Sequence, residues 1–458
     1  MEGINIYSRI GAKSFFKRNG FAENIVVSHD GVASNEPVKL RISFFGRNFD
    51  VHQLYDFFQK GCELSEFVEI DGTLAKIEYN LFEIIGYVLS GDFERDCLKE
   101  GLDLAKIGKM PYLDVLEQKL VGIIAKLYNQ NGFPLLRKHF PFSICLTHDV
   151  DEVRKTYQYF TRTLRFAKSG EVSRSFKELQ NFFIDKIKGE NPFWTFEKLM
   201  EVENSYKVRS TFFFLEESAK VTANPVSWKH YGRRYKFDDE NVTKIIKELD
   251  KNGWEVSLHG SYNSFNDLNL LEMEKSKLEK ALGKKVFGIR QHNLNFSIPY
   301  TWEIQRKAGF LYDTSLGFKC SDGIGFRWGT SKPFKPFTEQ GEEIDILEIP
   351  LTLMDISLKS PEEGREAVEK LISSVKDFGE VFCVLWHHAF FNPRDFGEWI
   401  ELYSYILELG KTKGAEFLTA SEINDIWRKR EESPLKVVYG KNKVAYSCDY
   451  PFVRMDVV

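Results

Sequence analysis

Two acidic residues, Asp149 and Asp151, follow an apolar run over residues 142–147. Apolar residues at this density predict a buried strand, and a spacing of two residues directs both carboxylates toward the same side. Two carboxylates that share a site repel one another unless a positive charge lies close to them. A metal ion, bound by one acid while the other serves as a base, would meet this requirement; a solvated strand end is the alternative reading.

Short apolar runs alternate with capped amphipathic helices from residue 142 onward. Strands alternating with helices of this length imply right-handed crossovers and a parallel sheet. Seven or eight repeats over roughly 280 residues fit a distorted (β/α) barrel, which typically needs about 250 residues. An open doubly wound sheet is the runner-up, although no Gly-x-Gly-x-x-Gly follows the first strand. The predicted strands are 142–147, 210–215, 255–260, 286–291, 310–315, 346–353, 381–387 and 416–420.

Polar side chains capable of chemistry stand at the ends of several of these strands. In a barrel of this kind the catalytic groups come from the carboxyl ends of different strands. Each such residue could instead be a polar strand end or a core histidine, so their convergence on one rim is the informative feature. The rule selects Asp149, Asp151, His259, Arg290, His292, His387 and His388.

The charge, hydropathy and cysteine content of the chain limit the classes of protein to which it could belong. The chain has 458 residues, with 63 Lys and Arg against 67 Asp and Glu, a formal net charge of -4. Bulk electrostatics therefore indicate neither a nucleic-acid nor a membrane partner. No apolar run approaches the ~20 residues that span a bilayer, and the start lacks a signal-peptide pattern, so we expect a cytoplasmic protein without a membrane span. Six scattered cysteines without a Cys-x-x-Cys pair predict reduced thiols.

The sequence predicts three parts. Residues 1–140 read as a smaller α+β domain of unknown role, with a strand at 38–45 and a helix at 114–127. Residues 141–431 hold the barrel, whose first crossover is long and mostly helical. Residues 432–458 read as a C-terminal tail with a small hairpin.

Five segments, in chain order, resemble the successive motifs of the polysaccharide deacetylase family, the NodB-homology group of carbohydrate esterases. The resemblance covers residues from about 142 to 430. The preceding region is similar to an N-terminal domain found ahead of deacetylases whose first motif is His-Asp-Val-Asp. The resemblance implies a distorted (β/α) barrel and metal-dependent removal of acetyl groups from N-acetylated sugars. The segments are Thr147-His-Asp-Val-Asp151, Ser210-Thr-Phe-Phe-Phe214, Trp254-Glu-Val-Ser-Leu-His-Gly-Ser-Tyr-Asn-Ser264, Arg290-Gln-His292 and Leu385-Trp-His387.

The resemblance also implies roles for individual residues. Asp149 would be the general base that deprotonates the attacking water, and Arg290 would keep it ionised. His387 would be the general acid that gives a proton to the departing amine. Asp151 and His259 would hold one divalent metal ion, with zinc expected first and manganese or cobalt as alternatives.

The family usually places a second histidine four residues after the first metal-binding one, and this sequence has Asn263 there. We expect Asn263 to be the third ligand, with Ser264, His292 or water as alternatives. An amide oxygen is a harder, neutral ligand that should weaken a zinc site and favour oxygen-loving metals.

Four residues are candidates for contact with a carbohydrate substrate, namely His292, Asp313, Arg327 and Trp328. A purely structural role is the alternative for the last three. The expected activity is hydrolysis of the N-acetyl amide of an amino sugar or saccharide. The alternatives are a carbohydrate-binding barrel with a degenerate metal site, a hydrolase of a non-sugar amide and, more distantly, a glycosyltransferase.

Overall fold

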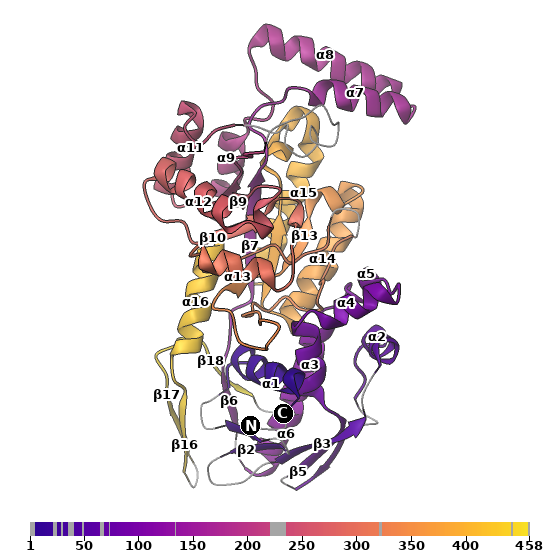
Figure 1. Ribbon diagram of the computed structural model, residues 1–458, viewed down its shortest axis with the longest axis vertical. Coiled ribbons are helices and arrows are strands. Elements are labelled where there is room, and N and C mark those ends of the chain that lie inside the picture. The colour runs from indigo at the N-terminus through magenta and orange to yellow at the C-terminus, as the bar shows by residue number, and fades with distance from the viewer. Residues whose placement is uncertain are drawn as a thin grey trace.

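The protein has a barrel at its centre, with the N-terminal region at one end and a helical hairpin projecting from the other (Figure 1). No described helix is long and apolar enough to cross a membrane. The cysteines within the described ranges, Cys62, Cys97, Cys145, Cys383 and Cys448, are all free; Cys320 lies outside those ranges. The computed structural model describes residues 5–21, 25–28, 31–34, 41–47, 50–64, 68–72, 74–132, 134–219, 235–319, 323–440 and 443–456.

The central sheet is parallel and has the strand order β12-β11-β10-β9-β8-β7-β14-β13, with β15 also paired to β7. The strands at the two ends of this order, β12 and β13, are separated only by Ile349 and Pro350. Because they follow one another directly in the chain, β12 and β13 act as two halves of one interrupted strand that brings the two edges of the sheet together. Proline has no N–H to donate to a ladder, which accounts for the interruption. The distorted (β/α) barrel is therefore confirmed. Its strands are β7 Ser143–Val150, β8 Thr211–Phe214, β9 Glu255–Gly260, β10 Gly288–Gln291, β11 Tyr312–Asp313, β12 Leu347–Glu348, β13 Leu351–Met354, β14 Val381–Leu385 and β15 Glu416–Phe417.

Strand β7 lies at the middle of this sheet, and every one of its residues is buried. Its apolar side chains fill both faces, as expected for a parallel strand covered on each side. The register places Asp149 beside Phe213 of β8 and Thr147 beside Leu385 of β14. The carboxyl ends of neighbouring strands thus meet on one rim, as the sequence predicted.

Helices cover the outside of the barrel. Ser360 accepts a hydrogen bond from the Glu363 backbone N–H and caps a helix with Pro361 in its first turn, as predicted. The long first crossover is helical, also as predicted. The helices are α7 Gln158–Lys168, α8 Val172–Lys188, α9 Phe196–Tyr206, α11 Glu240–Lys251, α12 Leu268–Leu282, α13 Tyr300–Lys307, α14 Pro361–Phe378, α15 Pro393–Thr412 and α16 Ala420–Glu432.

The N-terminal region combines helices with two small sheets. The strand predicted at 38–45 corresponds to β3, although residues 38–40 lie outside the described part, and the helix predicted at 114–127 lies within α6. The helices are α1 Ile6–Arg18, α2 Val51–Gln59, α3 Leu81–Leu89, α4 Asp92–Lys99, α5 Leu104–Ile107 and α6 Tyr112–Gln130; the strands are β1 Ile25–Ser28, β2 Gly31–Ser34, β3 Arg41–Arg47, β4 Val68–Asp71 and β5 Leu74–Tyr79.

The N-terminal region and the barrel share buried ion pairs. Arg18 of α1 binds Asp114 and Glu117 of α6 at 3.0 and 2.9 Å, and Lys332 of the barrel binds Glu117 at 3.1 Å. The division of the chain near residue 140 remains a proposal, because this interface continues the core rather than interrupting it.

The C-terminal tail contains the predicted hairpin, formed by β16 Lys436–Gly440 and β17 Lys443–Ser447. A further strand, β18 Val453–Asp456, was not predicted. It pairs antiparallel with β6 Leu135–Lys138, which lies between the N-terminal region and the barrel. The tail is therefore tied back to the junction of the two regions.

Candidate active site

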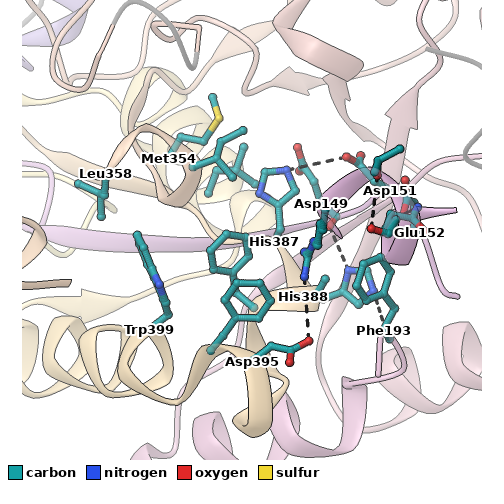
Figure 2. A pocket seen from close by; sticks show the side chains of 18 of the residues that line it. Asp149, Asp151, Glu152, Phe193, Met354, Leu358, His387, His388, Asp395 and Trp399 are labelled. Carbon is teal, nitrogen blue, oxygen red and sulfur yellow. Dashed lines mark hydrogen bonds and ion pairs between the residues drawn. The ribbon is translucent and has the colours of Figure 1, made fainter. Parts of the chain in front are cut away.

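A cavity of ≈ 2220 Å³ opens at the carboxyl ends of the barrel strands. Its walls include Asp149, Asp151, His259, His292 and His387, which come from four different strand ends. Figure 2 shows Asp149, Asp151 and His387 close together, with the His387 ring turned toward Asp151. With His388, six of the seven residues that the strand-end rule selected line this cavity.

Asp149 is paired with a buried arginine. Arg290 Nη1 donates to Asp149 Oδ1 at 2.9 Å and to Thr147 Oγ1 at 2.6 Å. Burial lowers the pKa of Arg290, but the charge of Asp149 outweighs this and keeps that pKa above its ordinary value. The other carboxylate oxygen, Oδ2, lies 3.4 Å from His259 Nε2. Arg290 therefore fixes one oxygen of Asp149 and leaves the second facing the reactive groups.

Asp151, His259 and His292 form a cluster in which one ligand atom from each residue lies within 4.8 Å of the others. His259 Nδ1 donates to the Arg290 carbonyl oxygen at 2.9 Å, so Nε2 carries the lone pair and faces Asp151 Oδ1 at 3.3 Å. His292 Nε2 lies 3.9 Å from the same oxygen. One carboxylate and two imidazoles are a donor set that suits a divalent cation with positions left open.

The electrostatics of the cluster also fit a cation. Burial lowers the pKa of His259, but Asp149 and Asp151 outweigh burial and leave that pKa above its ordinary value. Two carboxylates beside one imidazole are an excess of negative charge that a bound cation would offset.

His387 follows β14 and is held by an aspartate that the sequence analysis missed. Its Nδ1 donates to Asp355 Oδ1 at 2.8 Å, and its backbone N–H donates to Asp355 Oδ2 at 2.6 Å. Burial lowers the pKa of His387, but Asp355, together with Asp151 and Asp149, outweighs this and raises the pKa to about 9. Asp355 directly follows β13, so the strand-end rule would have found it had it been applied to that strand.

His388, the next residue, has the opposite environment. Its Nδ1 lies 3.2 Å from the Asp149 carbonyl oxygen, its Nε2 lies 3.1 Å from the Phe193 carbonyl oxygen, and its ring stacks on Phe196. Burial lowers its pKa to about 4. His388 is thus neutral at physiological pH, and its ring packs against the backbone of Asp149 and of Phe193.

Asn263, the expected third ligand, is not brought to the cluster. It is exposed, it precedes a 3-10 turn over Ser264–Asn266, and it is not among the residues that line the cavity. Glu274 of α12 accepts a hydrogen bond from the Ser261 backbone N–H at 3.1 Å and holds the chain where it leaves β9. His292, predicted as a substrate contact and an alternative ligand, takes the position beside Asp151 and His259.

The three other predicted substrate contacts do not line the cavity. Asp313 is fully buried and accepts a hydrogen bond from Ser315 Oγ at 2.6 Å. Arg327 and Trp328 donate to Glu94 of α4 at 2.9 and 2.6 Å. These two residues therefore join the barrel to the N-terminal region, and the contacts and burial favour the structural alternative for all three.

An aromatic group that sequence reasoning missed lines the cavity beyond His387. Phe390 stacks on Phe396 with ring centroids 4.5 Å apart and contacts Trp399 edge to face at 5.4 Å. Aromatic faces of this kind can pack against the apolar faces of sugar rings. In the sequence, these residues could not be told apart from core aromatics.

No family model matches the sequence, and no curated protein matches it. Solved structures similar to the chain include a protein of Mycobacterium smegmatis assigned as a polysaccharide deacetylase, with 15% identity, 66% of this chain and 95% of that chain covered, and a TM-score of 0.41. The PuuE allantoinase has 12% identity, 63% and 91% coverage and a TM-score of 0.41. BA3943, a CE4 family pseudoenzyme from Bacillus anthracis, has 13% identity, 62% and 66% coverage and a TM-score of 0.33. These similarities do not establish the activity of this chain, which has to be inferred from the residues of its own site.

Proposed function

We propose that this protein is a metal-dependent hydrolase that removes N-acetyl groups from an amino sugar or saccharide. The proposal rests on three groups of interacting residues that meet at one cavity. They are the pair of Asp149 and Arg290, the cluster of Asp151, His259 and His292, and the pair of His387 and Asp355. Together they supply a base, a cation site and an acid, which are the groups that amide hydrolysis requires.

The roles follow from the contacts. Asp151, His259 and His292 would hold a divalent cation, with zinc as the first candidate, which when bound supplies Lewis acidity to the amide carbonyl and to water. Asp149, which Arg290 holds through Oδ1, takes a proton from the attacking water through its other oxygen, Oδ2. His387 gives a proton to the departing amine, since its raised pKa keeps it protonated at neutral pH. The aromatic group of Phe390, Phe396 and Trp399 would hold the sugar ring.

The test is acetate release by protein supplied with zinc, manganese or cobalt, across a panel of N-acetylated amino sugars and their oligomers. We expect release from some members, and we expect Asp149→Asn to abolish it while leaving the circular dichroism spectrum unchanged. Failure of every metal-loaded sample on the whole panel would refute the proposal. Saccharide binding without release would favour a non-catalytic barrel. Hydrolysis of cyclic amides in the same assay would favour a non-sugar substrate. A cytoplasmic location remains a prediction.

A further inference from the structure

Helices α7 and α8 form a hairpin that projects from the barrel on the side away from the N-terminal region (Figure 1). Its exposed surface carries a group of large apolar side chains. Seven of the thirteen exposed large hydrophobic side chains among the described residues lie on it, with exposed fractions of up to 85%. We call these seven the apolar stripe: Phe160, Leu164, Val172, Phe176, Phe183, Ile184 and Ile187.

An ordinary surface helix buries its apolar face and exposes its polar face, whereas α8 does the reverse. On α8 the buried residues are polar, namely Ser175, Glu178, Asn181 and Asp185. Two of them are bound by charged residues outside the hairpin: Glu178 by Lys155 at 2.6 Å and Asp185 by Arg394 at 2.7 Å. The polar face of α8 therefore fixes the hairpin to the rest of the molecule, and the apolar face is left outside.

The exposed apolar residues are aligned along the helix. At 100° per residue, Val172, Phe176, Phe183 and Ile187 of α8 fall within about 60° of arc. Phe160 of α7 extends this surface, because it packs against Phe182 of α8 with ring centroids 5.3 Å apart. Seven exposed large apolar side chains gathered on one hairpin indicate a binding surface.

The charge of the hairpin selects the kind of partner. Residues 158–188 contain seven Lys and Arg and three Asp and Glu, a net charge of +4 in a chain whose net charge is -4. Two of the three acids, Glu178 and Asp185, are buried in ion pairs, so the basic excess is larger at the outer surface. The basic residues are Arg162, Arg165, Lys168, Arg174, Lys177, Lys186 and Lys188.

We propose that the hairpin docks on a bilayer that contains anionic lipids, with the apolar stripe at the level of the acyl chains and the basic residues at the headgroups. Apolar residues on one face and lysine and arginine on the polar face are the features of helices that lie in a membrane interface. A second copy of the chain fits less well, because two hairpins that each carry a net charge of +4 would repel one another. The near-neutral composition of the whole chain conceals this local surface.

Flotation with vesicles tests the proposal and needs no catalytic activity, so its result is independent of the proposed function. We expect the full chain to float with vesicles of phosphatidylcholine and phosphatidylglycerol at a ratio of 3:1, and to float far less with phosphatidylcholine alone or in high salt. Phe176→Asp with Ile187→Asp should weaken binding by at least about tenfold, since each change removes a large apolar contact. Lys186→Glu with Lys188→Glu should weaken binding to anionic vesicles alone.

The matched control is Leu98→Asp with Phe287→Asp, which changes two exposed apolar residues outside the hairpin and should bind as the wild type does. All variants sit on the surface and should keep the wild-type melting temperature, which is checked first. Absence of binding to anionic vesicles, or equal binding by the Phe176 and Ile187 variant, would overturn the proposal. A dimer that is lost in that variant, without vesicle binding, would assign the stripe to a second copy instead.

Discussion

Two neighbouring histidines show how the environment sets chemistry at the scale of a single residue. His387 contacts a carboxylate and its pKa is raised to about 9, whereas burial lowers the pKa of His388 to about 4. At neutral pH one ring is charged and the next is neutral. Only His387 can then serve as a proton donor to a leaving group. The sequence places both at the end of one strand, and only the family resemblance singled out His387; strand position alone could not distinguish them, since the difference comes from Asp355, which follows another strand.

Removing Asp355 should change the pH dependence of the proposed reaction. The general acid must be protonated, so activity should fall as pH rises through the pKa of His387. Asp355→Asn removes a charge that raises this pKa and should move the alkaline limb of kcat/KM to lower pH, with a smaller kcat. The control is Glu362→Gln, an exposed residue on the cavity wall that should leave the limb in place. An unchanged limb in Asp355→Asn would argue against His387 as the acid.

The choice between two candidate metal ligands can be tested by binding alone. His292→Ala removes a donor within 4.8 Å of the other two and should weaken the affinity for zinc by more than about tenfold. Asn263→Ala changes an exposed residue outside the cavity and should leave that affinity unchanged. Competition against a chromophoric chelator measures both. The reverse order of effects would restore Asn263 as the ligand.

At the scale of elements, the sequence predicted the strands because dense apolar runs between capped helices mark a buried parallel sheet. It ended the first strand at residue 147, whereas β7 continues to Val150. His148 and Asp149 are polar, and hydropathy cannot show that they are buried. Glu274 of α12 binds the Ser261 backbone N–H just before Asn263, a contact across elements that spacing does not reveal. The sequence also could not show that α8 buries its polar face, because the hydropathy pattern does not say which face of a helix packs against the barrel.

The ion pairs between α1, α6 and the barrel should make Arg18 important for stability. Arg18→Met leaves Asp114 and Glu117 buried with Lys332 as their remaining cation. The expected loss is about 3–5 kcal/mol of the free energy of unfolding at pH 8, measured by chemical denaturation. The control, Arg95→Met, removes an exposed pair with Asp92 and should cost at most about 1 kcal/mol.

The loss in Arg18→Met should depend on pH. Burial already raises the pKa of Asp114 to about 6, so between its ordinary value and pH 6 the folded state binds a proton that the unfolded state lacks. Stability from this group is therefore present at low pH and falls as pH rises through that window. Without Arg18 the pKa should rise further, and the variant should be less destabilised at pH 5 than at pH 8. An equal loss at both values would show that the carboxylates find another partner.

At the scale of the whole molecule, the hairpin of α7 and α8 forms part of the wall of the candidate active-site cavity. The cavity wall includes four basic residues of the hairpin, Arg162, Arg165, Arg174 and Lys177, and the cavity floor holds Asp149 and His387. The residues of α8 that line the cavity, Arg174, Lys177, Glu178 and Asn181, lie on the helix face opposite the apolar stripe. The hairpin would therefore stand between the cavity and a bilayer that meets the stripe.

The two proposals together predict that vesicles change the choice of substrate. An acetamido sugar linked to a lipid and embedded in anionic vesicles should be hydrolysed faster than the same sugar in solution, because docking raises the local concentration of enzyme. Phe176→Asp with Ile187→Asp should lose at least about tenfold in rate on the embedded sugar and keep the wild-type rate on the soluble one. Equal loss on both substrates would place the two residues in the fold of the site instead. If the wild type and the variant hydrolyse the embedded and the soluble sugar at equal rates, docking makes no contribution to catalysis.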